Sequence, residues 1–516
     1  MRTMSPTALI IGAGPVGLTM AAELMRLGVP VRIIDKAAAR TDKSKALVIW
    51  SRTLELMDRM SCADDFIRAG VRVTGANIAA GGPGGDAIGH VTFDSVDSPH
   101  PYALMIPQSE TERLMEEHLA ARGVRVDRTV ELTAFRPRED HVDATLRHAD
   151  GREEPVRARW LLGCDGAHSA VRHGLGMTFE GETLPSEWIL ADVHLAGLGD
   201  RSHEINLFWH GVGVLAMFPI MPDSGRYRVI ADVGDGGGDA TEVGNISRTP
   251  PTLEQVQALL DQRGPGGVVA SAPVWLAAFR INERKVADYR HGNVFLAGDA
   301  AHIHSPAGGQ GMNTGMQDAF NLAWKLAAVH HGLAAPEPLL SSYSTERSAV
   351  GRQVLADAGR LTALAIMRNR AAQVIRNHVA ALAFGVPCSP LPGIMADKLT
   401  ELAIGYPESP LTVRRRIGHA PSDPAPGSRA PISGSPESRI GARDGLDAVR
   451  FVLCATDDEQ ARAFVRDHAA FVSQQIRPPF ADGGLWLVRP DGYVSMAVKQ
   501  GEWSALDAFV RLFAAK

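Results

Sequence analysis

Three glycines near the start of the chain, Gly12, Gly14 and Gly17, have the spacing of a phosphate-binding turn. A short apolar run precedes them and apolar residues at helical spacing follow, which predicts a buried strand, a tight turn and a helix. The first N–H groups of such a helix have no partner within it, so they attract anions. Gly14 would let the backbone approach a pyrophosphate, while Gly12 and Gly17 would permit the turn and close helix packing. The turn predicts a nucleotide site without deciding between FAD and NAD.

Asp35 ends the next apolar run, Val31–Ile34, eighteen residues after Gly17. Two strands joined by one helix make a βαβ unit with parallel strands. A carboxylate at the end of the second strand can accept hydrogen bonds from ribose hydroxyls. The segment therefore predicts a Rossmann-like domain within an α/β fold.

Two later segments also place polar residues after apolar strands. Leu161–Gly163 leads to Asp165 and Gly166, and Val294–Ala297 leads to Gly298 and Asp299. The first segment has an alternative interpretation as an ordinary strand-to-helix turn, in which an Asp or Ser side chain caps the helix. In the second segment, a carboxylate at a strand end could meet a polyol chain.

A glycine-rich turn from Pro306 to Asn313 follows and opens a long predicted helix. Free N–H groups at the start of that helix would form an anion site. They could stabilise negative charge on a reduced isoalloxazine ring. A purely structural loop is the alternative, and the presence of all three cofactor segments together disfavours it.

In their order and spacing these segments resemble the FAD-dependent aromatic hydroxylases of the p-hydroxybenzoate hydroxylase and phenol hydroxylase kind. The strings Gly298–His302 and Gly308–Asn313 look most similar to the phenol and polyketide hydroxylase branch. The resemblance covers about residues 6 to 390. The tail around Leu487–Val494 resembles the thioredoxin-like C-terminal domain of that branch. It has no Cys-x-x-Cys pair, so a redox role for the tail is not expected.

The resemblance implies a set of cofactor contacts in this chain. Asp299 would bind the ribityl chain, Asp165 is associated with both FAD and NAD(P)H, and Pro306 would lie beside the reactive flavin carbon as a catalytic residue. Two positions depart from the family pattern: Asp35 replaces the more usual Glu, and Lys45 stands where Arg is often found. The full set of expected cofactor contacts is Gly12, Gly14, Pro15, Val16, Gly17, Asp35, Lys36, Lys45, Arg52, Gln108, Asp165, Gly166, Asp299, Pro306, Gly309, Gly311, Met312 and Asn313.

The family's reaction is the expected activity. NAD(P)H would reduce FAD, O2 would add at the flavin C4a position, and the resulting hydroperoxide would transfer oxygen to a phenolic or polyketide-like aromatic ring. The cofactor supplies the chemistry, and the protein must exclude water and favour the phenolate. The chain has no second G-x-G-x-x-G unit, which fits a nicotinamide coenzyme that binds transiently, as NADH or NADPH.

The substrate pocket is expected between the flavin and a strand-rich segment. Phe208 and His210 would share one face of their strand and Trp209 the other. His210 and Tyr227 are candidate catalytic groups, although each can equally be a buried, hydrogen-bonded structural residue. His302 and His304 lie in a loop without a carboxylate triad, so no metal site is expected. The candidate lining residues are Phe208, Trp209, His210, Met217, Phe218 and Pro219.

These elements predict four regions. Residues 1–180 and 275–395 would form a discontinuous Rossmann-like FAD-binding domain, and residues 181–274 a β-rich substrate-binding insert. Short strand patterns at 205–210, 212–218 and 227–232 support the insert, and a helical pattern spans 315–385. Residues 396–440, with a Pro/Ser/Gly-rich stretch at 420–438, would be helix and linker. Residues 441–516 would form the thioredoxin-like α/β domain.

Composition restricts the remaining possibilities. A net charge of −5 argues against a nucleic-acid binder, which usually carries a basic excess. The four cysteines are too widely spaced for a disulfide framework or a metal site, so reduced thiols in the cytoplasm are expected. No signal peptide is expected, and no apolar run approaches the ~18 residues that span a bilayer. An apolar stripe within 345–385 would serve core packing or a homodimer.

Three alternatives to aromatic hydroxylation stay open at this level. Baeyer–Villiger insertion or epoxidation would use the same fold with different oxygen chemistry. A flavin dehydrogenase or reductase would not use O2 as a substrate. A non-catalytic FAD-binding module is disfavoured by the complete set of cofactor segments. A flavin halogenase is disfavoured because the chain has no Trp-x-Trp-x-Ile-Pro segment.

Overall fold

The predicted βαβ unit opens a six-stranded sheet. The computed structural model describes residues 6–42, 45–235, 249–385, 389–413, 423–431 and 448–513. β1 (Ala8–Ile11), α1 (Pro15–Arg26) and β2 (Val31–Asp35) follow one another as the sequence indicates. β1 pairs in parallel with β2 and with β12, in the strand order β18-β19-β12-β1-β2-β8. The other strands are β8 (Asp127–Arg128), β12 (Trp160–Gly163), β18 (Arg290–His291) and β19 (Val294–Leu296). The Rossmann-like α/β prediction is confirmed.

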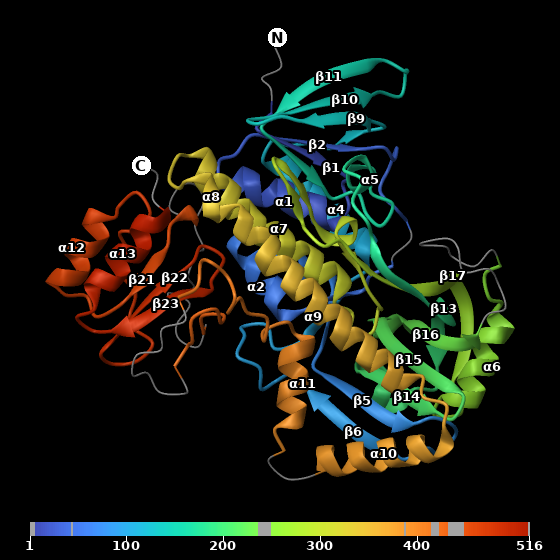
Figure 1. The fold of residues 1–516 in the computed structure, drawn as a ribbon. Coiled ribbons are helices and arrows are strands. Elements are labelled where there is room, and N and C mark those ends of the chain that lie inside the picture. Colours follow the sequence, from blue (N-terminus) through green and yellow to red (C-terminus); the bar gives the residue numbers. More distant parts are fainter. Residues whose placement is uncertain are drawn as a thin grey trace.

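Helices cover this sheet and bury its central strands. α1 lies beside α7 (Gly311–His330) and also contacts α4 (Gln108–Ala121) (Figure 1). α1 begins with Pro15, whose missing N–H costs nothing at the first helical position. All residues of β1, β12 and β19 are buried, as expected for parallel strands with helices on their faces.

A small antiparallel sheet packs beside the first one, at the top of Figure 1. It consists of β9 (Glu131–Pro137), β10 (Val142–Arg147) and β11 (Glu153–Ala158). Its side chains alternate with the strand period, so Val142, Ala144 and Leu146 enter the main core. A second small sheet joins β3 (Val48–Ile49), β7 (Ala103–Met105) and β4 (Val71–Val73).

The strand-rich segment forms an eight-stranded sheet of order β20-β17-β13-β16-β15-β14-β5-β6. The three predicted strands appear as β14 (Ile205–His210), β15 (Gly213–Met221) and β16 (Arg226–Asp235). The other members are β5 (Gly75–Ala80), β6 (Ala87–Thr92), β13 (Glu180–Ala196), β17 (Val269–Lys285) and β20 (His302–Ile303). β5 lies beside β14, and β6 lies beside β5, although both come from much earlier in the chain (Figure 1). The sheet therefore draws on residues outside 181–274.

This sheet has two differently covered faces. We call the side that packs on α6 (Leu253–Arg263) the outer face, and the opposite side the inner face. The outer face buries Phe208, Met217 and Tyr227 together with Val256 and Leu260 of α6. On the inner face, Trp188, Val214 and Ile281 pack with Trp209, Phe279, and Ala365 and Ile366 near the end of α9 (Ser341–Ala365).

The region predicted as helical from 315 to 385 contains four separate helices. These are α7, α8 (Pro336–Leu339), α9 and α10 (Arg370–Gly385). The first break follows α7 at Gly332, whose φ of 67° belongs to the left-handed region that glycine tolerates. α11 (Leu391–Leu399) follows, and α10 runs past β6 (Figure 1). No helix of the described residues is long and apolar enough to cross a membrane.

The C-terminal residues form a small α/β unit of their own. β21 (Val452–Cys454), β22 (Gly484–Val488) and β23 (Val494–Lys499) make an antiparallel sheet, accompanied by α12 (Glu459–Asp467) and α13 (Trp503–Phe513). It lies beside α2 (Ser51–Arg59) and α7 (Figure 1). Of the predicted linker stretch 420–438, only residues 423–431 are described.

Candidate flavin site

The first glycine turn has the geometry of a phosphate cradle. Gly12 has a φ of 98°, and a Cβ there would lie 2.4 Å from Cys164 O. A Cβ at Gly17 would lie 2.0 Å from Gly12 O, so both positions are filled by backbone. A Cβ at Gly14 would meet nothing within 4 Å. Gly14 precedes Pro15 as the N-cap of α1, and it is the cradle glycine that faces open space.

Asp35 shapes this turn from the end of β2. Its Oδ2 accepts from Ala13 N at 2.7 Å and its Oδ1 accepts from Ala37 N at 2.8 Å. Each carboxylate oxygen has a further lone pair, so these bonds leave room for a ribose hydroxyl. The expected ribose contact stays a prediction, and the observed role is to hold the loop.

Asp165 lies against the same cradle. A Cβ on Gly12 would be 2.8 Å from its Cα. Its carboxylate accepts from Ser169 Oγ at 2.6 Å and from Val171 N at 3.2 Å, at the start of α5 (Ala170–Gly174). Burial raises the pKa of this carboxyl. The side chain makes the helix-capping contacts of the alternative interpretation, while Gly166, with a φ of 77°, borders open space.

Asp299 is the unpaired carboxylate of the site. It lies just beyond β19, where a Cβ on Gly298 would come within 2.7 Å of Val16 Cγ2. No hydrogen bond or ion pair from a described residue reaches the Asp299 side chain, which is solvent-accessible but surrounded by protein. Burial raises the pKa of Asp299, and positive charge at His302 and Lys45 opposes the rise. An open carboxylate in a hollow suits a polyhydroxyl chain.

A buried network behind Asp299 fixes its position. Asp318 of α7 accepts from Gly298 N at 2.9 Å, from His302 Nε2 at 2.8 Å and from Arg347 Nε at 2.6 Å. Burial would raise the pKa of Asp318, but the charges of Arg347 and His302 hold it below its ordinary value. Asp318 therefore joins the strand carrying Asp299 to the helix that opens the glycine-rich turn.

The glycine-rich turn is held from the side of β3. Trp50 Nε1 donates to Gly308 O at 2.9 Å, and Trp50 N donates to Asn313 Oδ1 at 2.9 Å. Asn313 Nδ2 donates to Val48 O at 2.9 Å. The Asn313 side chain therefore makes its hydrogen bonds within the protein. Separately, the first backbone N–H groups of α7, from Gly311 onward, have no partners within the helix. Pro306, Gly309 and Met312 belong to the same turn, and Pro306 is exposed.

Arg52 requires a correction. Its guanidinium is buried against the C-terminal unit, donating to Asp491 O at 2.8 Å and to Glu55 at 2.9 Å. It also lies over the Tyr493 ring at 4.9 Å. These contacts leave Arg52 no path to a cofactor, because it lies on the side of α2 that faces the C-terminal unit.

The remaining expected cofactor contacts lie near the loop after β2. Gln108 accepts from Ala46 N at 3.2 Å and donates to Glu112 at 2.9 Å. Lys36 and Lys45 are exposed, and Lys45 is close enough to Asp299 for its positive charge to lower the pKa of that carboxyl. Their direct contact with a cofactor stays a prediction.

These residues fit an FAD molecule. The cradle is open only at Gly14, the Asp299 carboxylate is unpaired in its hollow, and α7 presents its first N–H groups beside them. Each feature supplies the chemistry that one part of FAD requires: pyrophosphate, ribityl chain and ring, in that order.

The comparisons with known proteins agree with this geometry. The family described as FAD binding domain matches residues 5–358. The chain belongs to that family. It is 36% identical to 6-methylpretetramide 4-monooxygenase of Streptomyces rimosus, over 98% of this chain and 92% of that protein. It is 37% identical to pentachlorophenol 4-monooxygenase of Sphingobium chlorophenolicum, over 69% of this chain and 64% of that protein.

Solved structures give the same result. OxyS anhydrotetracycline hydroxylase from Streptomyces rimosus is 29% identical, with a TM-score of 0.76 and coverage of 99% of this chain and 100% of that one. The predictions of FAD as cofactor and of an aromatic-hydroxylase type of monooxygenase are confirmed.

Several residues expected to contact the substrate of this monooxygenase lie on the outer face of the sheet, away from the flavin segments. Phe208, Met217 and Tyr227 are on the outer face, buried against α6. The Tyr227 hydroxyl donates to Ser202 O at 3.0 Å, so it serves the structure. His210 shares the face of Phe208 and accepts from Val212 N at 3.3 Å. Burial lowers the pKa of His210, and the charge of Arg263 lowers it further. These placements correct the catalytic roles expected for His210 and Tyr227.

Two candidates lie on the inner face. Phe218 packs with Val48 and Trp50, next to the glycine-rich turn, and Trp209 packs with Phe279. Pro219 is paired with Tyr227 in the ladder, on the side away from Phe218. The structure thus brings Trp209 and Phe218 to the face that meets the flavin segments, and separates the other four from it.

The inner face holds further residues that sequence reasoning missed. Ladder pairing places Asp192 opposite both Arg228 and Trp275. Arg228 is 1% exposed, binds the Asp192 carboxylate at 2.7 and 2.8 Å, and donates to Lys45 O at 2.9 Å. It therefore links the inner face to the loop beside Asp299. Because side chains alternate along β16, Arg228 and Tyr227 lie on opposite faces of the sheet. The sequence alone does not show which of these faces lies toward the flavin.

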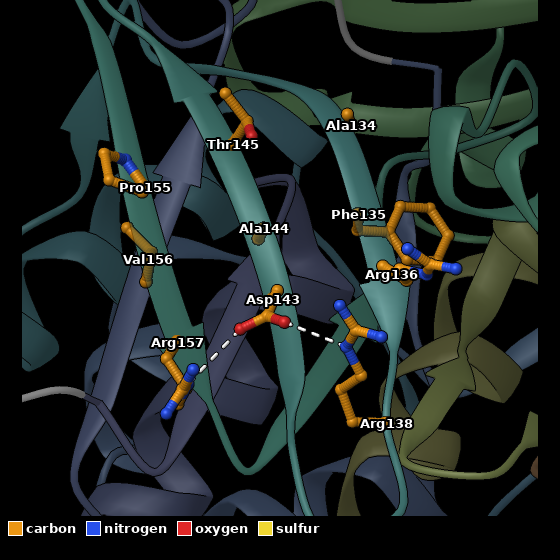
Figure 2. Close-up of a pocket in the computed structure, with 10 residues that line it drawn as sticks. All are labelled: Ala134, Phe135, Arg136, Arg138, Asp143, Ala144, Thr145, Pro155, Val156 and Arg157. Atoms are coloured by element: carbon orange, nitrogen blue, oxygen red, sulfur yellow. Dashed lines mark hydrogen bonds and ion pairs between the residues drawn. The ribbon is translucent and has the colours of Figure 1, made fainter.

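A separate hollow of about 660 Å³ lies on the exposed side of the β9–β11 sheet, and Figure 2 shows its lining. Asp143 bridges Arg138 at 3.0 Å and Arg157 at 3.2 Å. None of the cofactor segments contributes to this hollow, and its arginines are at the surface. It is distinct from the flavin site.

Proposed function

We propose that this monooxygenase hydroxylates a phenolic or polyketide-like aromatic ring, using O2 and NAD(P)H. The observation that supports this most directly is the inner face of the eight-stranded sheet, which carries the aromatic side chains Trp209, Phe218 and Phe279. Phe218 belongs to the same apolar cluster as Trp50, whose indole N–H donates to Gly308 O of the glycine-rich turn. All three are only partly buried, although Arg376 of α10 lies over the Trp209 ring at 4.5 Å. The exposed parts of the three rings offer aromatic surface to a flat ligand. The relatives named for pentachlorophenol and for tetracycline-type aromatics support the same substrate class.

Different residues would bind different parts of the cofactor. Gly14 and the start of α1 would hold the pyrophosphate, Asp299 the ribityl chain, and the first turn of α7 the ring. Pro306 would border the reactive side of the ring. Bound FAD would accept a hydride and activate O2. The protein's part is to orient the substrate against the inner face and to exclude water, because water competes for activated oxygen.

Three further assignments accompany this proposal. The FAD-binding domain is proposed to comprise residues 1–180 and 275–395, with the substrate insert at 181–274. A cytoplasmic location is supported by the three described cysteines, Cys62, Cys164 and Cys454, which are all free. A homodimer is proposed through the exposed apolar residues of α10, among them Ile375, Val379 and Leu382.

The test follows an isotope from O2 into product. The FAD-loaded protein is mixed with NADH or NADPH, O2 labelled with a heavy oxygen isotope, and a panel of hydroxylated aromatics. The masses of the products are then measured by mass spectrometry. One heavy oxygen on an intact aromatic ring is the expected result. A ring-expanded lactone would instead indicate Baeyer–Villiger chemistry. Coenzyme oxidation that leaves every aromatic unlabelled would indicate a reductase and overturn the proposal.

A further inference from the structure

Glu401, two residues after the end of α11, combines two unfavourable features. It is 1% exposed, and its carboxyl oxygens are bound by the neutral side chains Thr314 and Gln317 rather than by a cation. Its φ of 61° lies in the left-handed region, which residues other than glycine rarely adopt. Buried acids and unusual backbone conformations both cost free energy, and they occur preferentially at functional sites. A functional explanation for Glu401 is therefore worth seeking in its contacts.

Both hydrogen-bond donors to the carboxyl group belong to the beginning of α7. Thr314 Oγ1 donates to Glu401 Oε1 at 2.8 Å, and Gln317 Nε2 donates to Oε2. Residues three apart lie on the same side of a helix, so the carboxyl group joins two successive turns. Thr314 belongs to the first turn of α7, whose N–H groups have no partners within the helix. Glu401 is thus bound to the part of α7 that is proposed to hold the flavin ring.

The end of α11 makes two further contacts with the glycine-rich turn. Gln310 Nε2 donates to Lys398 O at 2.7 Å. A Cβ on Gly308 would lie 3.4 Å from Leu399 Cδ2. Together with Glu401, these contacts extend from the glycine-rich turn to the second turn of α7. The end of α11 therefore holds the segment that presents free N–H groups.

The same part of α7 packs closely against the other cofactor segments. A Cβ on Gly315 would lie 2.7 Å from Val16 Cγ2 and 3.1 Å from Gly298 Cα. Val16 follows the phosphate cradle, and Gly298 precedes Asp299. A shift of the first turn of α7 would therefore change its position relative to both of these segments. Glu401 acts on the flavin site through this helix.

The protonation state of Glu401 follows from its surroundings. Burial raises the pKa of this carboxyl to about 8, so it is mostly protonated at pH 7. The hydrogen bonds and the charge of Arg347 oppose the rise, while the charge of Asp318 supports it. Arg347 Nε donates to Asp318 at 2.6 Å, so these two charges largely compensate each other. A small change of charge nearby is then enough to add or remove the proton.

The other ionisable groups of the elements around Glu401 are engaged with different partners. They are Arg52 of α2, which donates to Glu55 at 2.9 Å, Lys398 of α11, which lies 3.7 Å from Asp357 of α9, and Tyr406, whose hydroxyl accepts from Arg347 Nη1 at 3.0 Å.

Gln317 offers an acceptor for the carboxyl proton. Its Oε1 is buried and has no hydrogen-bond partner within the described part of the chain. Turning the amide group over would exchange Oε1 and Nε2, so that Oε1 could accept from a protonated Glu401. The same amide can therefore serve either protonation state of the carboxyl group.

We propose that Glu401 is a positioning residue for the flavin: its carboxyl group holds the first turn of α7 in place, and loss of its proton disfavours negative charge on a reduced ring at that turn. The inference rests on the proposed binding of the ring by α7. A hydride from NAD(P)H brings two electrons and one hydrogen to the flavin, which then carries negative charge. An ionised Glu401 would respond by taking one proton from solvent, which forms an O–H bond on the carboxylate.

The test measures the midpoint potential of FAD bound to the protein from pH 6 to pH 10, by equilibration with a reference dye. In wild type the potential should fall more steeply above pH 8, by the slope of one additional proton per two electrons. Glu401→Gln cannot ionise, so it should lack the steeper region and have a higher potential than wild type at pH 10. Asp397→Asn is the matched control and should follow wild type, because Asp397 is an exposed carboxylate of α11 near Arg429 and Asp97.

A binding measurement tests the contact with α7. Glu401→Gly suits the left-handed backbone but has no side chain to bind Thr314. The loss of this hydrogen bond should raise the Kd for FAD about 10-fold and alter the visible spectrum of the bound flavin. Glu401→Gln can still accept from Thr314, so it should keep the Kd and the spectrum of wild type. Equal Kd values for all three proteins would contradict the positioning role.

Infrared spectroscopy of wild type tests the proton uptake without any variant. Reduction at pH 9 should produce a protonated-carboxyl band that shifts in D2O. Absence of this band, or the same pH dependence of the potential in wild type and Glu401→Gln, would overturn the inference. These measurements need bound FAD but no aromatic substrate. A wild type that hydroxylates no aromatic would therefore overturn the proposed function alone.

Discussion

At the scale of single residues, Asp299 is the strongest test of the flavin site. It is an unpaired carboxylate in a hollow, and the Asp318 network holds the strand end that carries it. Asp299→Ala should therefore release FAD while the protein stays folded. The measurement is the ratio of flavin to protein absorbance after gel filtration, beside far-UV circular dichroism. A variant that keeps full yellow colour would contradict the ribityl assignment.

Asp143→Ala is the matched control for that experiment. It removes a carboxylate from the hollow of the β9–β11 sheet, where Asp143 bridges Arg138 and Arg157 (Figure 2). Solvent and salt screen ion pairs at the surface, so this variant should keep both its FAD and its stability.

Glu401 gives a pH dependence at the same scale. Burial raises the pKa of this carboxyl to about 8, although Thr314 Oγ1 donates to it at 2.8 Å. A carboxyl with a raised folded pKa stabilises the fold below its unfolded pKa, and that stability is lost as pH rises toward 8. Glu401→Gln mimics the protonated form. Its free energy of unfolding should exceed that of wild type by more at pH 8 than at pH 5, as measured by urea denaturation. An equal difference at both pH values would contradict a buried, protonated Glu401.

Individual contacts were the least predictable part of the site. The cofactor glycines and Asp299 could be found because their roles depend on local backbone geometry after a strand. Arg52 was misplaced because the C-terminal unit, more than 400 residues away in the chain, supplies its partner Asp491.

At the scale of elements, the positions of the strands could be predicted from the sequence. The side of the sheet on which each side chain lies, toward α6 or toward the flavin segments, could not. β14, β15 and β16 appear close to their expected positions, because alternating apolar residues reveal a strand. Alternation shows that Phe208 and Trp209 point to opposite sides, but both sides of this sheet are apolar. Which side meets α6 and which meets the flavin segments depends on how distant helices pack, and no local pattern encodes that.

The two faces can be separated by a pair of variants in β14. Phe208→Ala removes an outer-face aromatic that is 2% exposed, so it should cost about 3–5 kcal/mol of stability and leave substrate KM unchanged. Trp209→Ala changes the partly exposed inner face, so it should raise KM for the aromatic substrate with a smaller stability loss. Urea denaturation and steady-state kinetics measure both effects. A larger KM effect from Phe208→Ala would contradict the assignment of the faces.

At the scale of the whole molecule, the C-terminal unit and the flavin-binding helices share one buried charge cluster. Arg489, just after β22, binds Glu346 of α9 at 2.7 Å and Asp491 at 2.6 Å, and Lys325 of α7 binds Glu346 at 2.7 Å. Each of these side chains is at most 4% exposed. Removing one partner of such a cluster leaves buried carboxylates uncompensated, which costs about 3–5 kcal/mol.

Arg489→Met should therefore destabilise the entire molecule. Because α7 also opens the glycine-rich turn, loss of the cluster should release FAD at the same urea concentration at which circular dichroism is lost. Arg511→Met, whose ion pair with Asp507 is at the surface, is the control and should change stability by no more than about 1 kcal/mol. If Arg489→Met unfolds in two steps, with flavin retained after the first, the C-terminal unit is an independent domain. A single transition would mean that this unit is part of the scaffold that holds the flavin, which gives a tail without a cysteine pair a structural function.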